Sequence, residues 1–479
     1  METNFGNLIV NFKFIPPMIN IDILASNIHY ICILISCNLV FYWRILNYDF
    51  ISDDLSVYMR KEPEPKNALH RWWLQFRCRR YFNQKEVHLM NIFFHTLNSI
   101  LIYFLFGSNL LSFCTAMLFL LNPVNSQCSI WASGRSYCIS TTFVLLMFLF
   151  PVFSPLFYFF TKFFSANAIF SPLTFMTTPY WFWALMPLGL IFFIRKGLIE
   201  KSKTNVSNEM KAIGLRKLVT FAKCYGYYFV LCIFPFHLGW HHEYVWGIGV
   251  TDKYNKACYS LNKSFWWSLL LVCIVSANLI FNWSPQLWGL LWFSVNIAMW
   301  CNFLTWQQQI AERFCYLANV GMMAFLGALL WKLPYPANLI LIGMFIAFYA
   351  TKLWLITPMY KNEYWRIEHT AIDKPKSHYI WLYRGFNKFH NQDFVGALYD
   401  FIEARVHSPH EFKVNFNLAS TYIVLQNIEE AKKCLKIAEE NMYTGEESKL
   451  KPMIDKTWEH IKTAEETKII DMNKVILYS

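Results

Sequence analysis

Charged residues are scarce in this chain. Asp, Glu, Lys and Arg make up 15% of its 479 residues, whereas hydrophobic residues make up 56% and the aromatic residues Phe, Tyr and Trp 19%. A water-soluble chain of this length needs more polar residues to cover its surface. The composition therefore excludes an ordinary soluble protein and predicts an integral membrane protein.

Paired cysteines are also missing. The thirteen cysteines fall mostly singly within apolar runs, and none form a Cys-x-x-Cys pair. This pattern indicates neither a disulfide framework nor a zinc site, and it predicts that the cysteines are small buried residues. His237 and His241 have helical spacing but no further ligand pattern, so no metal site is assigned and a divalent metal ion remains an option only.

The sequence contains about eleven apolar runs of roughly 15 to 22 residues, the length that crosses a membrane as a helix. They lie at residues 22–43, 88–106, 108–121, 137–151, 156–170, 179–194, 218–237, 265–282, 286–305, 318–332 and 337–357. The first has no small-residue cleavage site after it, so we expect a retained helix and not a signal peptide. We predict an all-α fold: a polytopic membrane bundle over residues 1–357, a linker over 358–377 and a small soluble helical tail over 378–479.

The net charge of +12 belongs to the membrane part. From Tyr360 onward the chain has 17 Lys and Arg residues and 18 Asp and Glu residues. The part before Tyr360 therefore has 26 basic and 13 acidic residues. Such an excess suits anionic lipid head groups or a phosphate-bearing substrate, although basic residues also set membrane topology. Membrane lipid is therefore a predicted partner, and nucleic acid is not.

The basic loop 195–217 predicts the orientation of the chain, because such loops stay in the cytoplasm. Counting helices from it places the N-terminus in the cytoplasm and the tail on the outer or lumenal side. Four polar loops (47–86, 122–136, 238–264 and 305–318) then share that outer face. We expect a bacterial inner membrane or an ER-type membrane; the AT-rich codon bias implied by the composition makes the mitochondrial inner membrane the alternative.

Two motifs carry polar residues near the first spans. Asp53 and Asp54 form a carboxylate pair that could act as a general base or bind a cation, and the alternative is a solvated turn. In the second span the offsets of 3, 7 and 10 residues predict one polar helical face. That face consists of His88, Asn91, His95 and Asn98. It either meets substrate or holds the bundle together by interhelical hydrogen bonds.

Two further motifs carry arginines. Arg135 lies at the predicted start of a helix, where its guanidinium and the free N–H groups could hold a phosphate; an interfacial anchor is the alternative. Glu312 and Arg313 are adjacent, so on a helix they point to different sides and each needs its own partner. A structural salt bridge elsewhere is the alternative for this pair.

The tail shows a period of 34 residues. Three apolar positions of the first unit recur in the second: Ala397, Phe401 and Ala404 return as Ala431, Leu435 and Ala438. This pattern resembles the tetratricopeptide repeat, a helix pair that buries its apolar face by stacking on its neighbours. We expect the tail to dock on the membrane domain or on a protein partner.

The four motifs in this order, followed by such repeats, resemble the multi-spanning GT-C glycosyltransferases with C-terminal tetratricopeptide repeats, relatives of the protein O-mannosyltransferases. The resemblance implies transfer of a sugar, with inversion, from a polyprenyl-phosphate carrier to a hydroxyl of a protein or glycan. It implies Asp53 or Asp54 as the base and Arg135 and Arg313 as ligands of the donor phosphate. The remaining polar site residues that it implies are His88, Asn91, His95, Glu312 and Tyr316.

The chain departs from that family at two positions. Where the family usually has His-Pro-Val-x-x-Glu before Gly-Arg, this sequence has Asn122 and Gln127. An ionisable pair has thus become neutral. The alternative prediction is a catalytically degenerate GT-C-like structural subunit of a larger membrane complex, for which an organelle is one location, and a transporter is a third option.

Overall fold

The structure is a computed structural model, and its described residues divide into two compact units, with the boundary along the chain between Glu363 and Tyr364. The described residues are 25–51, 54, 83–164, 171–177, 183, 215–239, 265–270, 272–273, 285–303, 310–373, 378–442, 447–467 and 469–478. Their regular secondary structure is helical, with no strand among them. The prediction of an all-α fold is confirmed for this part of the chain.

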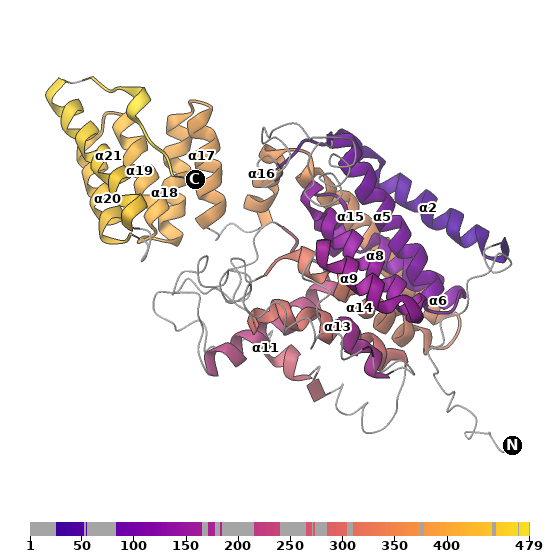
Figure 1. The fold of residues 1–479 in the computed structure, drawn as a ribbon. Helices are drawn as coiled ribbons and strands as arrows, with labels where there is room; N and C mark the ends of the chain where they lie inside the picture. Colours follow the sequence, from indigo (N-terminus) through magenta and orange to yellow (C-terminus); the bar gives the residue numbers. More distant parts are fainter. Residues whose placement is uncertain are drawn as a thin grey trace, which may run out of the picture. The chain divides into compact units, whose positions relative to one another are not determined.

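The first unit is built from apolar helices (Figure 1). They are α2 (Ile28–Tyr42), α5 (Gln84–Leu105), α6 (Leu110–Leu121), α8 (Arg135–Leu149), α9 (Ser154–Phe164), α11 (Leu215–Ile233), α13 (Pro285–Ala298), α14 (Cys315–Trp331) and α15 (Ala337–Ile356). Capping boxes fix where two of them begin. The Asn83 side chain accepts from Glu86 N, and the Glu86 carboxylate accepts from Asn83 N. Asn109 and Ser112 do the same for α6.

Five described segments are long and apolar enough to cross a membrane. They are Ile28–Asn47, Gln84–Leu105, Ala132–Leu149, Glu312–Trp331 and Ala337–Tyr360. Four more helices are apolar but shorter: Leu110–Leu121, Pro151–Thr161, Phe221–Ile233 and Trp288–Cys301. The predicted runs 179–194 and 265–282 lie mostly outside the described residues. The first unit is therefore compatible with a membrane protein, and the count of eleven spans stays a prediction.

The apolar helices differ in how much of them the protein covers. The α8 segment is 83% buried, whereas the segment that contains α15 is 17% buried although it is the most apolar of the five. Large side chains such as Ile340, Met344 and Leu355 are exposed on α15. An exposed face of this kind is stable next to lipid and unfavourable in water. The exposed face of α15 is therefore compatible with contact to lipid.

The second unit consists of α16 (Glu363–Asp373), α17 (His378–His390), α18 (Phe394–His407), α19 (Phe412–Val424), α20 (Ile428–Glu440) and α21 (Glu447–Thr467). The range 358–377, predicted as a linker, contains α16. Helices α17 and α19 begin 34 residues apart, and so do α18 and α20. The turns repeat as well, since Gln392 and Gln426 have φ of 65° and 61°. The period in the sequence is thus a period in structure.

An ion pair joins the first two helices of this repeat. The Asp400 carboxylate is fully buried and accepts two hydrogen bonds from Arg384, at 2.9 and 2.7 Å. Lys388 Nζ lies 2.9 Å from the same carboxylate. The buried charge of α18 is thus balanced by two cations of α17, which fixes the pairing of the two helices.

The second unit is expected to lose stability in mild acid through His378. Burial, with a smaller contribution from His407, lowers the pKa of His378 to about 4. His378 is therefore protonated near pH 6.5 in the unfolded chain, but only near pH 4 in the folded chain. The contribution of His378 to the free energy of unfolding is complete above pH 6.5. It decreases by about 3 kcal/mol as the pH falls from 6.5 to 4.

Hydrogen-exchange mass spectrometry on peptides from α17 and α18, corrected for intrinsic exchange rates, measures this loss of stability. In His378→Gln the decline of protection from pH 6.5 to 4 should become shallower. An identical decline in the variant and the wild type would show that His378 does not cause it.

Candidate functional site

The polar face of α5 is turned into the protein. Its four predicted members are at most 2% exposed: His88, Asn91, His95 and Asn98. On the other side of the same helix Leu89 and Phe93 are 55% and 58% exposed. The prediction of a single buried polar face on this helix is therefore confirmed.

His95 belongs to a hydrogen-bond network that joins four helices. Its Nε2 lies 3.0 Å from Leu120 O and its Nδ1 lies 2.7 Å from Tyr316 Oη. Because a carbonyl only accepts, Nε2 carries the proton and the Tyr316 hydroxyl donates to Nδ1. Asn98 Nδ2 in turn donates to Tyr316 Oη at 3.2 Å, and Thr142 donates to Asn98 Oδ1 at 2.7 Å. These bonds connect α5 to α6, α8 and α14. Of the two roles expected for this polar face, they correspond to interhelical hydrogen bonding.

Asp54 is held inside the protein by main-chain groups. Its Oδ1 accepts from Ser133 N at 2.9 Å and also from the Ser133 hydroxyl. Its Oδ2 accepts from Ile51 N at 3.3 Å, and the residue is 1% exposed. The alternative expectation, that Asp54 lies in a solvent-exposed turn, is therefore wrong. Asp53 lies outside the described residues.

Trp131 connects three segments at this end of the bundle. Its carbonyl accepts from Asn91 Nδ2 at 2.8 Å, and its indole N–H donates to Ile51 O at 3.4 Å. Arg313 Cζ lies 5.6 Å from the centre of the Trp131 ring and 4.9 Å from that of Phe314. Arg313 is thus placed by aromatic faces as well as by its own backbone.

The two positions that depart from the family pattern bond to main-chain groups. Gln127 Oε1 accepts from Arg313 N at 2.8 Å. Asn122 donates to Cys232 O at 2.8 Å, and its Oδ1 accepts from Val124 N at 3.0 Å. A carboxylate at position 127 could accept the same bond, so the neutral glutamine keeps the structural contact without the charge.

Arg135 and Glu312 are ionisable residues inside the protein. Arg135 is the first residue of α8, as predicted, and it is 2% exposed, with Nη1 3.5 Å from Met90 Sδ. Glu312 is fully buried at the start of the 3-10 turn Glu312–Phe314, whereas Arg313 is partly exposed. The two adjacent charges therefore have different surroundings, as expected. Buried charges are costly, which makes both positions candidates for function.

The hairpin of residues 122–134 is where the predicted site residues meet. Asp54, Asn91 and Arg313 all contact it between Gln127 and Ser133, although they lie on three distant segments. His95 and Tyr316 form the separate network described above. The arrangement offers carboxylate acceptors and guanidinium cations, and among the described residues no group of three or more His, Cys, Asp or Glu side chains could hold a metal ion.

Sequence reasoning missed Trp131 and Ser133, which make most of these contacts. Both lie in the polar loop 122–136, but nothing in their spacing distinguishes them from their neighbours. No protein family model, curated protein or solved structure matches the chain.

Proposed function

We propose that this protein is a GT-C-like glycosyltransferase that moves a sugar from a polyprenyl-phosphate carrier to a hydroxyl of a protein or glycan. The observation that supports this best is the meeting of Asp54, Asn91 and Arg313 on one polar hairpin. Carboxylate and guanidinium groups at one end of an apolar bundle suit a substrate with a lipid tail and a phosphate head.

In the proposed reaction, the base removes the proton of the acceptor hydroxyl while the oxygen attacks the anomeric carbon. The bond from that carbon to the carrier phosphate breaks, and the phosphate leaves with the electron pair. Since the Asp54 carboxylate already accepts from Ser133 and Ile51, Asp53 is the candidate base and Asp54 a positioning residue. Arg313 and Arg135 stabilise the charge on the departing phosphate.

The proposal includes the predicted topology and tail. Eleven spans would place the N-terminus in the cytoplasm and the hairpin on the outer or lumenal face, in a bacterial inner membrane, an ER-type membrane or, alternatively, the mitochondrial inner membrane. The helix pairs α17–α18 and α19–α20 would be tetratricopeptide repeats that bind a protein partner. Their 34-residue structural period supports this assignment.

Arg313→Gln is expected to lower sugar transfer about a hundredfold, because one donor to the leaving phosphate is lost. The assay follows transfer of labelled hexose from a polyprenyl phosphate by the protein reconstituted in vesicles. Arg44→Gln is the matched control: Arg44 also lies over a tryptophan, at 3.9 Å from the Trp354 ring centre, but it belongs to the 3-10 helix η2 (Trp43–Asn47), and its guanidinium donates to Trp354 O and not to the hairpin. Equal loss in both variants, or no transfer by the wild type with any hexose donor, would reject the proposal.

A second candidate function is that of a non-catalytic GT-C-like subunit of a larger membrane complex. Two observations favour it. Both ring nitrogens of His95 are hydrogen-bonded within the bundle, and Gln127 accepts from the backbone of Arg313, so these motif residues hold segments of the protein together. Co-purification of the chain at a fixed ratio with a large complex, together with no transfer activity, would support this function over the first.

A further inference from the structure

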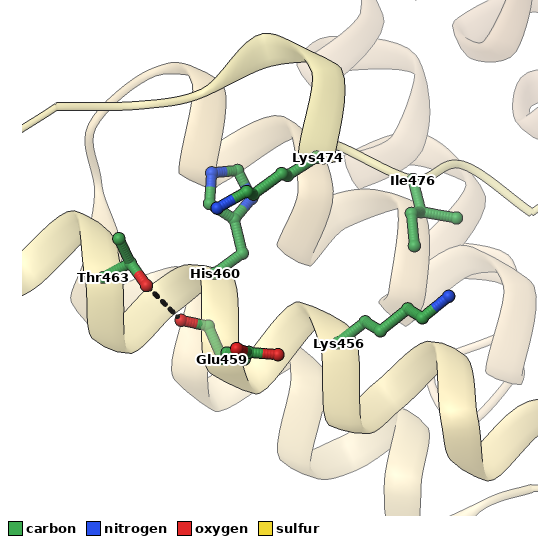
Figure 2. Close-up of a pocket in the computed structure, with 6 residues that line it drawn as sticks. All are labelled: Lys456, Glu459, His460, Thr463, Lys474 and Ile476. Atoms are coloured by element: carbon green, nitrogen blue, oxygen red, sulfur yellow. Dashed lines mark hydrogen bonds between the residues drawn. The ribbon is translucent and has the colours of Figure 1, made fainter.

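A cavity of about 360 Å³ lies in the second unit, between α21 and the C-terminal segment (Figure 2). Its lining residues are Lys456, Glu459, His460, Thr463, Lys474 and Ile476. The first four come from two turns of α21, and the last two from the segment that follows it. The volume lies within the range of small-molecule sites, roughly 300 to 1,000 Å³.

The wall opposite α21 is fixed in place. Asn417 of α19 makes two bonds to Tyr478: its Nδ2 donates to Tyr478 O at 3.0 Å, and its Oδ1 accepts from Tyr478 N at 2.8 Å. Ser420 donates to Ile476 O at 2.5 Å. The segment that carries Lys474 and Ile476 is therefore anchored to the repeat, so the cavity has two structured walls.

His460 is the residue that points to a ligand. It is 3% exposed, and neither of its ring nitrogens has a hydrogen-bond partner among the described residues. Figure 2 shows its ring rising from α21 toward Lys474. Leaving a buried polar atom without a partner costs about 1–3 kcal/mol. A bound group that pairs with the imidazole would remove this cost.

The other polar groups of the cavity define the chemistry of that ligand. Neither Lys456 nor Lys474 forms an ion pair within the described residues, so the cavity presents two free ammonium groups. The carboxylate of Glu459 is likewise unpaired there, while the Thr463 hydroxyl donates to Glu459 O at 2.9 Å. The Lys474 ammonium beside the His460 imidazole suits a phosphate, and the Lys456 ammonium and the Glu459 carboxylate suit sugar hydroxyls.

We propose that this cavity binds a small phosphorylated sugar, of about the size of a hexose phosphate. Lys474 and His460, which lie beside each other in Figure 2, hold its phosphate; Lys456 and Glu459 bond to its hydroxyls, and Ile476 packs on the apolar side of the ring. Burial lowers the pKa of His460, an effect that Asp471 opposes and Lys474 reinforces. The site lies in the tail and does not depend on sugar transfer by the membrane unit.

Isothermal titration calorimetry of the full chain in detergent with glucose 6-phosphate tests the proposal. We expect saturable binding by the wild type, and binding about tenfold weaker in Lys456→Gln and in Lys474→Gln because each loses one charged contact. Lys462→Gln is the matched control, since Lys462 is exposed on the same helix but does not line the cavity. It should bind as the wild type does.

Two comparisons can overturn the proposal. Binding of glucose as tight as that of glucose 6-phosphate would show that the phosphate is not recognised, and equally tight binding of inorganic phosphate would show that the sugar is not. Undetectable binding of glucose 6-phosphate by the folded wild type, or equal affinity in all three lysine variants, would also reject the site.

Discussion

Replacing Asp53 with asparagine is expected to lower sugar transfer by about a thousandfold, because the general base is lost. Asp54→Asn should differ. Its amide oxygen can still accept from Ser133, so we expect much of the transfer to remain. Its NH2 group cannot accept from Ile51 N, and the bonds to Ser133 lose their charge, so the free energy of unfolding should fall by about 1–2 kcal/mol. Initial rates in vesicles and thermal unfolding in the same detergent separate the two effects.

The two variants are isosteric and adjacent, so each is the control for the other. Loss of transfer in Asp54→Asn alone, with its stability unchanged, would exchange the roles assigned to the pair. Full activity in the double variant would contradict the proposed glycosyl transfer itself and leave the structural-subunit function as the better account.

Gly134→Ala is expected to destabilise the first unit by about 3 kcal/mol, through overpacking of the hairpin. An added Cβ would lie 2.6 Å from the carbonyl oxygens of both Gln127 and Cys128, and 2.7 Å from Cys128 Cα. These are backbone atoms, so relief requires movement of the turn that receives Asp54 and Arg313. Thermal unfolding in detergent should show a clear drop in midpoint, accompanied by loss of any transfer activity.

Gly343→Ala is the control for this steric argument. Gly343 lies in α15, and a Cβ added there would have no atom within 4 Å. Alanine should therefore leave stability unchanged or raise it by up to about 1 kcal/mol, since it favours a helix more than glycine does. Similar losses in both variants would show that the close approach at Gly134 is not the cause.

Local features of the chain were predictable because they depend on neighbours in the sequence. The apolar runs predicted helices, the offsets of 3, 7 and 10 predicted the buried face of α5, and the 34-residue period predicted the repeated helix pairs of the tail. Arg135 also stands at the start of its helix as expected. Composition and periodicity carry this information, since side chains three or four apart share a helical face whatever surrounds it.

The partners of the site residues were decided by tertiary structure. Asp54 pairs with Ser133, 79 residues away, and Gln127 with the backbone of Arg313, 186 residues away. Such pairs depend on which helices pack together, and no local pattern encodes that choice.

By itself, the sequence thus determined that the chain is helical, apolar in its first part and repetitive in its tail. Only the packing of distant segments decided that Asp54 is a buried acceptor held by the hairpin and that His95 and Tyr316 bridge helices. It also decided that the C-terminal segment closes a basic cavity on α21. The physical reason is that a buried polar group must find a partner, and the fold determines which partner is within reach.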